Sequence, residues 1–349
     1  MEPVSQQDPA QRKLEYLSPS SIAKWENGVE EFYLHYLTPN RPPREPQTQP
    51  MSIGSAFDAY CKSYLHDKLF GKNHPDSNRF DFNAIFEAQV EPQHRDWALL
   101  NGAYAFQLYK ESGALTDLLV DLKSAKSNPR FEFEVRGLVN SEGHTEAMAR
   151  EINGVTLLGK PDAAYINKDN VHVILDWKVN GYCSKYPTSP MKGYVRLRGA
   201  GGQSWGCHKE CSPFEIGGMT INIGAFLEHF KTDWAQQLSI YAWLCGESIG
   251  SDFVVAVDQL SCKPSYSGYP TVRVAEHRIR ISRDFQWRVF RRSCEIWEII
   301  HSGHLFRDLS LEESIARCQL LDQQAEVLYG GNTEEDRHWL EMTNRGPRF

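Results

Sequence analysis

The sequence predicts an α/β fold in which helices flank a mixed central β-sheet and an N-terminal helical layer precedes that sheet. Three observations support this fold class. Apolar residues recur at helical spacing through the first third of the chain, alternate at strand spacing from about residue 130, and return to helical spacing between the later strands. The 349 residues, 41% of them hydrophobic, suffice for one large domain or two modest ones.

The helical layer opens with a strong start signal. Ser18 is a typical N-cap, Pro19 suits the first turn, and Leu17 can pack on Ile22. The organisation expected for the chain is a flexible tail (1–16), a helical region (17–125), a core (126–305) with an irregular insertion (181–224), and a C-terminal helical tail (306–349). The strands expected in the core are 131–139, 156–166, 171–179, 253–260 and 271–281, and the helices are about 230–247 and 283–302.

Composition narrows the function classes. The formal net charge of −7 gives no global basic field, although a local basic groove is compatible with it. The polar beginning lacks the apolar segment of a signal peptide, and no run of about 18 apolar residues predicts a membrane span. We therefore expect no membrane partner, a cytoplasmic location and reduced thiols for the eight cysteines.

The strand VHVILDWKVN, at 171–180, carries charge in a segment otherwise built to be buried. Because side chains alternate along a strand, Asp176 and Lys178 are neighbours on one face, roughly 7 Å apart. The other face is apolar throughout. This pattern predicts that the apolar face packs on a helix while Asp176 and Lys178 line a cleft.

Asp162 follows a proline and precedes Asp176 by fourteen residues. The turn signal at 167–170 predicts a hairpin, and a symmetric register would place the two carboxylates opposite each other, with Cβ atoms about 5 Å apart. Carboxylates this close repel, and a hard cation such as Mg²⁺ between them removes the repulsion. Lys178 could then orient or deprotonate an attacking water, or steady charge on a phosphate. The alternative is a solvated strand face with an exposed ion pair.

These residues carry a resemblance to a known family. GKPDAAYI, with Pro161 and Asp162, and ILDWKV, with Asp176 and Lys178, resemble the motif of the PD-(D/E)XK nuclease superfamily. The likeness covers roughly residues 17–300, although only the stretches 159–178 and 237–241 are specific. It implies a restriction-endonuclease-like sheet and cleavage of DNA phosphodiester bonds that depends on Mg²⁺ or Mn²⁺.

The resemblance extends to other candidate residues. Gln237 and Tyr241 match the Gln-x-x-x-Tyr helix of the RecB-like and phage-exonuclease branch, and at i and i+4 they share a helix face. Gln237 could bond the DNA or the acids, with Tyr241 packed beside it; the alternative is a satisfied interior pair. Asp58 stands where relatives often have a metal-binding histidine, and Glu134 could supply another acid from the preceding strand. Exposed acids are the alternative at both positions.

Other metal sites are not expected. Some relatives hold an iron–sulfur cluster, but the first helix here has no cysteine, and Cys294 and Cys318 lack close-spaced partners. The insertion offers potential structural-zinc ligands at Cys183, Cys207, His208 and Cys211. Their spacing is not typical of zinc sites, so free or buried thiols are the default expectation.

Two groups of basic residues are candidates for contact with DNA. They are Lys185, Lys192, Arg196 and Arg198 in the insertion, and Arg288, Arg291 and Arg292 on one helix face near Trp287. The alternatives are a solvated loop for the first group and ion pairs with acids such as Asp284 or Glu295 for the second.

The sequence therefore predicts a divalent-metal-dependent DNA nuclease, acting as an exonuclease on linear or single-stranded ends in recombination, repair or phage DNA metabolism. Such a protein would work in a bacterial or phage-infected cell, and a recombination or replication protein is a further candidate partner. The rival interpretations are a site-specific or structure-specific endonuclease, a catalytically silent nuclease fold that only binds DNA or a partner, and a small-molecule phosphohydrolase.

Overall fold

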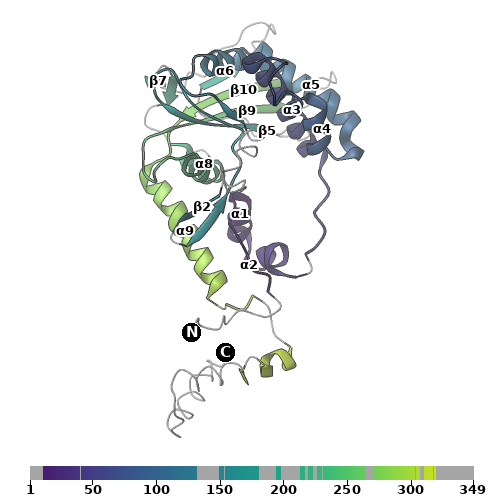
Figure 1. The fold of residues 1–349 in the computed structure, drawn as a ribbon, viewed down its shortest axis with the longest axis vertical. Coiled ribbons are helices and arrows are strands. Elements are labelled where there is room, and N and C mark those ends of the chain that lie inside the picture. The colour runs from purple at the N-terminus through teal and green to yellow at the C-terminus, as the bar shows by residue number, and fades with distance from the viewer. Residues whose placement is uncertain are drawn as a thin grey trace.

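A mixed sheet with helices on both faces organises the chain (Figure 1). Among the described residues, six strands form this sheet, in the order β1 (Arg130–Phe131), β4 (Ala163–Ile166), β5 (His172–Asn180), β9 (Val254–Lys263), β10 (Thr271–Ile279) and β6 (Tyr194–Leu197). Strands β5 and β9 are parallel, and the other neighbours are antiparallel. The computed structural model describes residues 11–39, 41–131, 149–152, 154–180, 194–197, 213–216, 219–222, 226–229, 231–263, 271–302, 304–306, 310–316 and 318–319.

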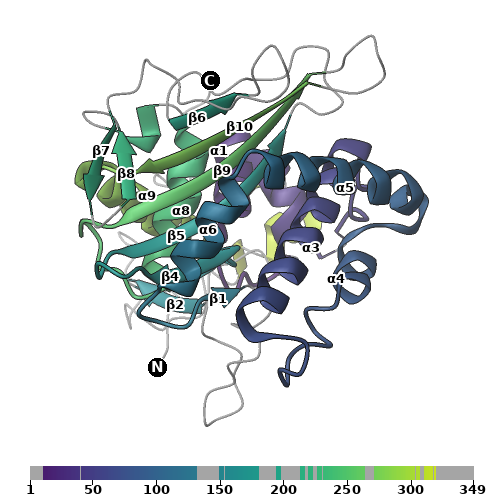
Figure 2. The same ribbon diagram turned by 90° about the horizontal axis from the view of Figure 1, so that it is seen from above.

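Two groups of helices cover the two faces of the sheet, as Figures 1 and 2 show. One face packs on α3 (Gln49–Phe70), α4 (Phe82–Gln89), α5 (Arg95–Glu111) and α6 (Ala114–Lys123). The other packs on α1 (Pro19–Asn27), α8 (Thr232–Leu244) and α9 (Arg283–His301). Shorter elements are α2 (Val29–Phe32), a π-helix (Tyr33–Leu37) and 3₁₀ turns at Pro92–His94 and Leu227–His229. This arrangement confirms the predicted α/β class.

Strand β5 is buried on both faces. Val173, Leu175 and Trp177 belong to the core under α3 to α6, whereas Ile174 belongs to the core under α1, α8 and α9. Ile174, on the same face as Asp176 and Lys178, is therefore part of a core and does not line the cleft. The reason is that β5 lies between β4 and β9 in a sheet covered on both sides, and such strands are apolar on both faces.

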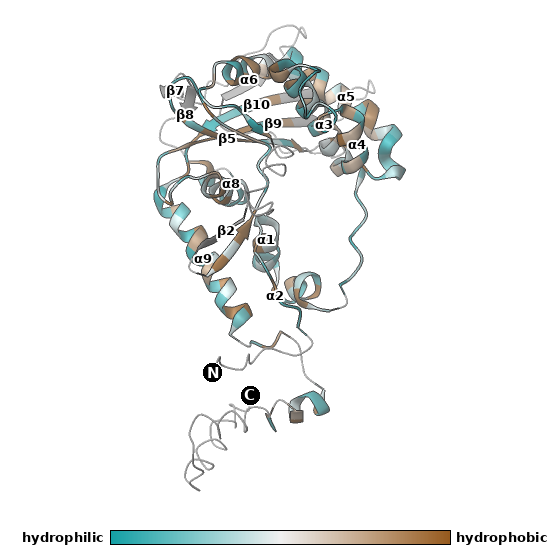
Figure 3. Ribbon diagram, viewed as in Figure 1, coloured by the Kyte–Doolittle hydropathy of each residue, from teal (hydrophilic) through white to brown (hydrophobic). Residues whose placement is uncertain are grey.

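The first helix begins as the sequence predicts. Ser18 caps α1, with its hydroxyl accepting from the backbone N–H of Ser21 at 3.2 Å. The helix ends at Asn27, and α2 restarts the helical path after Gly28. In the described residues no helix combines the length and apolar character that crossing a membrane requires. Helix α9 carries both hydrophilic and hydrophobic residues along its length (Figure 3), because one of its faces packs on the sheet core.

Two strand predictions need correction. The segment 156–166 is two strands and not one, since β3 (Val155–Leu158) pairs with β2 (Ala149–Ile152) before β4 begins. Pro161, between them, has no N–H to donate to a ladder. The insertion, predicted to be irregular, contributes β6 to the sheet and a hairpin of β7 (Pro213–Ile216) and β8 (Met219–Asn222). Most of the predicted strand 131–139 and of the C-terminal tail lies outside the described residues.

A buried ion pair ties β9 to β10 on the α3–α6 side. Arg278 Nη1 donates to Asp258 Oδ1 at 2.5 Å, and its Nη2 lies 3.8 Å from Glu276 Oε1. Asp258 is fully buried and also accepts from the Tyr109 hydroxyl. The guanidinium therefore compensates negative charge that water cannot reach.

We expect the Arg278→Met substitution to lower the free energy of unfolding by about 3–5 kcal/mol, because it leaves two buried acids without their cation. Arg280→Met is the matched control, since Arg280 pairs at 3.5 Å with the exposed Asp252 and should contribute about 1 kcal/mol or less. Urea unfolding of both variants measures the difference. Equal losses would contradict this account of the pair.

His277 makes stability depend on pH. Burial, with the positive charge of Arg278, lowers the pKa of His277 to about 4, and its Nε2 lies 3.2 Å from Gln259 Oε1. The unfolded chain has the ordinary pKa of about 6.5, so it binds more protons as pH falls from about 6.5 to 4. We expect unfolding free energy to drop by about 2 kcal/mol between about pH 7.5 and 5 through this group. Urea titrations should show that His277→Gln removes that part of the dependence; an unchanged pH slope would refute it.

Candidate functional site

The turn between β4 and β5 sets the register of the site. Asn167 accepts from the backbone N–H groups of Asp169 and Val171 at 3.0 and 2.8 Å, and Asn170 takes a left-handed φ of 68°. The resulting ladder pairs Ile166 with His172 and ends with Ala163 opposite Leu175. The next position along it holds Asp162 and Asp176. The symmetric register predicted from the sequence is therefore confirmed.

The two carboxylates are held at different depths. Asp162 is partly exposed, and its Oδ2 accepts from the backbone N–H of Trp177 at 2.8 Å. Asp176 is only 4% exposed. Its Oδ2 lies 2.6 Å from Lys178 Nζ, in an ion pair whose angles depart from hydrogen-bond geometry. Asp162 is thereby fixed to the strand that carries its partner.

A chain of hydrogen bonds runs from Lys178 to α8. Lys178 Nζ donates to Gln237 Oε1 at 2.9 Å, and Gln237 Nε2 donates to the Tyr241 hydroxyl at 2.8 Å. The spacing of Gln237 and Tyr241 puts both on the side of α8 that faces β5. Tyr241 also presses on Gly159, where an added Cβ would lie 2.5 Å from its ring. These two hydrogen bonds hold the Lys178 ammonium from α8, outside the sheet.

A second lysine approaches from the opposite face of the sheet. Lys62 on α3 is fully buried, and its Nζ lies 2.8 Å from Asp58 Oδ2 and 3.5 Å from Asp162 Oδ1. Gln89, the last residue of α4, donates to the same Asp58 oxygen at 3.0 Å. Lys62 and Gln89 were not predicted from the sequence as residues of the site. One sequence signal could have identified Lys62: it follows Asp58 at i, i+4 spacing and is next to the apolar Cys61.

Six candidate residues from the sequence line one cleft of about 360 Å³. They are Asp58, Asp162, Asp176, Lys178, Gln237 and Tyr241. The rest of the lining is Gly54, Ser55, Phe57, Gln89, Lys160, Trp177 and Val179. The cleft is open to solvent beside the start of β4 and the middle of β5, so a polymer or an extended ligand has access to it.

Burial and neighbouring charges shift the pKa values of three groups in the cleft. Burial raises the pKa of Asp176 to about 6; the Lys178 ammonium opposes this, and the nearby Asp162 adds to it. Burial lowers the pKa of Lys178, but the Asp176 carboxylate outweighs burial and the net direction is upward. Burial, and next the charge of Asp176, raise the pKa of Tyr241, which therefore stays a neutral phenol.

The donor set fits a small hard cation. Asp162 and Asp176 supply carboxylate oxygens from facing positions just beyond the β4–β5 ladder, and one of them is buried with its charge disfavoured. Within the described residues no three His, Cys, Asp or Glu side chains converge as a metal cage. Mg²⁺ and Mn²⁺ suit such a site, because water and phosphate oxygens commonly complete a shell begun by one or two carboxylates. Asp58 faces Lys62 and Gln89 instead of completing a trio of acids.

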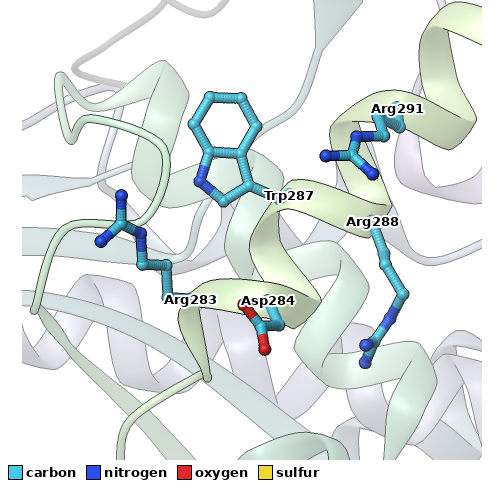
Figure 4. A pocket seen from close by; sticks show the side chains of 5 residues that line it. All are labelled: Arg283, Asp284, Trp287, Arg288 and Arg291. Carbon is cyan, nitrogen blue, oxygen red and sulfur yellow. The ribbon is translucent and has the colours of Figure 1, made fainter.

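A larger hollow, of about 510 Å³, lies on α9 and is lined by Arg283, Asp284, Trp287, Arg288 and Arg291. In Figure 4 Arg283 and Arg291 flank the indole of Trp287, and Arg288 extends to the other side of the helix. Gly250, before β9, abuts Trp287, whereas Asp176 pairs with Val257 further along β9. This hollow shares no lining residue with the cleft, in which acids and ammonium groups converge.

The remaining predicted residues divide into two sets. Arg292 pairs with Glu26 at 2.6 Å and with Glu295 at 3.1 Å. For this arginine the alternative prediction, an ion pair with an acid such as Glu295, is therefore confirmed. Arg196 lies on β6 opposite Val274. The others lie outside the described part of the chain: Glu134, Lys185, Lys192, Arg198, Cys183, Cys207, His208 and Cys211.

No family model matches the sequence, and neither the curated proteins nor the solved structures include a match to it. The geometry of the cleft is therefore the basis for any functional conclusion.

We expect Gly159→Ala to disturb the site through Tyr241. The new methyl group would lie 2.5 Å from Tyr241 Cε1 and 2.7 Å from Cδ1, so the ring must move and the bond from Gln237 is lost. Overpacking of this kind costs about 1–3 kcal/mol, which urea unfolding measures. Gly54→Ala is the control, because an added Cβ there meets nothing within 4 Å in the middle of α3. Equal stability of both variants would contradict the close contact.

Proposed function

We propose that this chain is a divalent-metal-dependent DNA nuclease of the PD-(D/E)XK superfamily, with a restriction-endonuclease-like sheet. The observation that carries the proposal is the meeting of Asp162, Asp176 and Lys178 at the open end of a β-hairpin. The motif resemblance supports it, because the two residues of the Gln-x-x-x-Tyr motif hydrogen-bond to each other and the glutamine also accepts from this lysine.

Asp162 and Asp176 would hold the cation. When bound, Mg²⁺ or Mn²⁺ would neutralise both carboxylates and stabilise charge that develops on a phosphate. Lys178 donates to Gln237, so it acts in the cleft as an ammonium donor held on one side. In that position it can orient an attacking water or stabilise charge on the phosphate oxygens. Trp177 supplies the backbone N–H that keeps Asp162 turned toward its partner.

Gln237 and Tyr241 would act as positioning residues in this scheme. Tyr241 remains protonated, so its hydroxyl is not a base in the neutral pH range. Its contact with Gln237 instead fixes the amide whose oxygen accepts from Lys178. A nuclease needs this kind of support, because small displacements of a group that contacts the phosphate reduce the rate strongly.

The proposed substrate is DNA, and the proposed activity is that of an exonuclease. The cleft is open, which suits a chain end or a single strand. Arg291, beside the exposed Trp287, and Arg288, which lines the same hollow, would contact a DNA segment outside the cleft. In the described residues neither arginine is engaged by an acid in an ion pair. An RNA or protein partner would have to account for the same basic and aromatic surface.

A nuclease assay tests the proposal. Linear duplex DNA labelled separately at each end should be shortened from its ends in Mg²⁺ or Mn²⁺, and closed circular DNA should persist. We expect Asp176→Asn and Lys178→Met each to lower the rate at least about 100-fold, because the first removes a ligand of the proposed cation and the second removes the ammonium that would act on the water or the phosphate. Asp169→Asn and Lys168→Met, exposed in the turn of the same hairpin, are the matched controls and should retain the wild-type rate.

The assay separates the rival functions. Cleavage of the closed circle would replace the exonuclease with an endonuclease. DNA binding without turnover, insensitive to Lys178→Met, would indicate a catalytically silent fold. A wild-type rate in Asp176→Asn would refute the assignment of the site.

A further inference from the structure

Lys62 is a buried cation inside the candidate site. Its side chain is 0% exposed, and a lysine buried so completely is rare unless acids compensate it. The compensating acids are Asp58, at 2.8 Å, and Asp162, at 3.5 Å. Because the second acid belongs to the proposed metal pair, Lys62 is part of the site and does more than support the helix.

The two lysines reach the carboxylates from opposite sides. Lys178 lies on the face of β5 that meets α8, and it is paired with Asp176. Lys62 extends from α3, which packs on the other face of the sheet. Asp162 lies between them, with Oδ2 on the Trp177 N–H and Oδ1 toward Lys62.

The position of Lys62 has a consequence for metal binding. Sites that use two metal ions hold them about 3.5–4 Å apart between shared carboxylates. Here the space between Asp58 and Asp162, where a second ion would bridge two acids, contains the Lys62 ammonium. Asp58 is further engaged by Gln89 at 3.0 Å, which orients its carboxylate toward the lysine.

We propose that Lys62 is a built-in cation that takes the place of a second metal ion, so that the cleft binds one divalent ion, held by Asp162 and Asp176. The inference rests on the proposed function and specifies its metal requirement. It also assigns Asp58 to Lys62 and not to the metal. A fixed ammonium has a benefit here: it keeps Asp162 compensated at any metal concentration.

Metal counting on the full chain, without DNA, tests this. Free Mn²⁺ is followed by its electron paramagnetic resonance signal during titration, and ions in the cleft are those lost in the Asp162→Asn, Asp176→Asn double variant. The wild type should bind one such ion. Lys62→Met, of similar size and without charge, should bind two, because Asp58 and Asp162 are then free to share an ion. Lys168→Met, the exposed control, should bind one.

Each outcome bears on a separate claim. Two cleft ions in the wild type, or one in a folded Lys62→Met variant, would overturn the role of Lys62 and leave the nuclease proposal standing. No cleft ion in the wild type would overturn the proposed metal site together with this inference. If Lys62→Met does not fold, Asp58→Asn decides: it should keep the affinity for the single ion within about threefold, and a loss beyond about tenfold would make Asp58 a ligand.

Discussion

Negative charge buried within a central strand is the constraint on which the rest of the site depends. Asp176 is almost inaccessible, Asp162 lies opposite it just beyond the β4–β5 ladder, and Asp58 on α3 lines the same cleft. Carboxylates in such surroundings are stable only beside cations and donors. Lys178 and Lys62 provide the cations, one from each side of the sheet. Two buried or half-buried lysines therefore compensate the acids of this one cleft.

The sheet explains how such a site remains open. Both faces of β5 are covered by apolar cores, and from Asp176 onward this strand still pairs with β9 but no longer with β4. The break at Pro161 ends β4 at that point and frees space beside Asp176. Helices α3 and α8 then supply one polar pair each, Asp58 with Lys62 and Gln237 with Tyr241. Rigid elements thus hold every polar group of the cleft that faces the carboxylates.

The hairpin and its register could be predicted from sequence because both are local. The Asn-rich turn fixes where the chain reverses, and a slip of one residue would move Asp176 to the other face of the sheet. The i, i+4 pair on α8 was predictable for the same reason. Lys62 was not, because its role depends on a contact with Asp162 across 100 residues of sequence. Burial of Ile174 was also missed, since it depends on helices distant in the chain.

The basic residues show that the sequence alone does not reveal what role each charge has. Arg292 seemed equivalent to Arg288 and Arg291 on the helix face, yet Glu26, far away in the sequence, pairs with it. Arg278, in a strand, proved to be the more important arginine for the fold, because Asp258 is buried beneath it. In both cases the partner decides what the charge does, and the partner is a product of the tertiary structure.

The most direct test of the account is an anomalous-scattering crystal structure of the chain grown or soaked with Mn²⁺. We expect a manganese peak between the carboxylates of Asp162 and Asp176, at the distance of about 2.0–2.2 Å that oxygen ligands of such ions adopt. Absence of a peak there at saturating Mn²⁺, or carboxylates turned to opposite faces of the sheet, would contradict it.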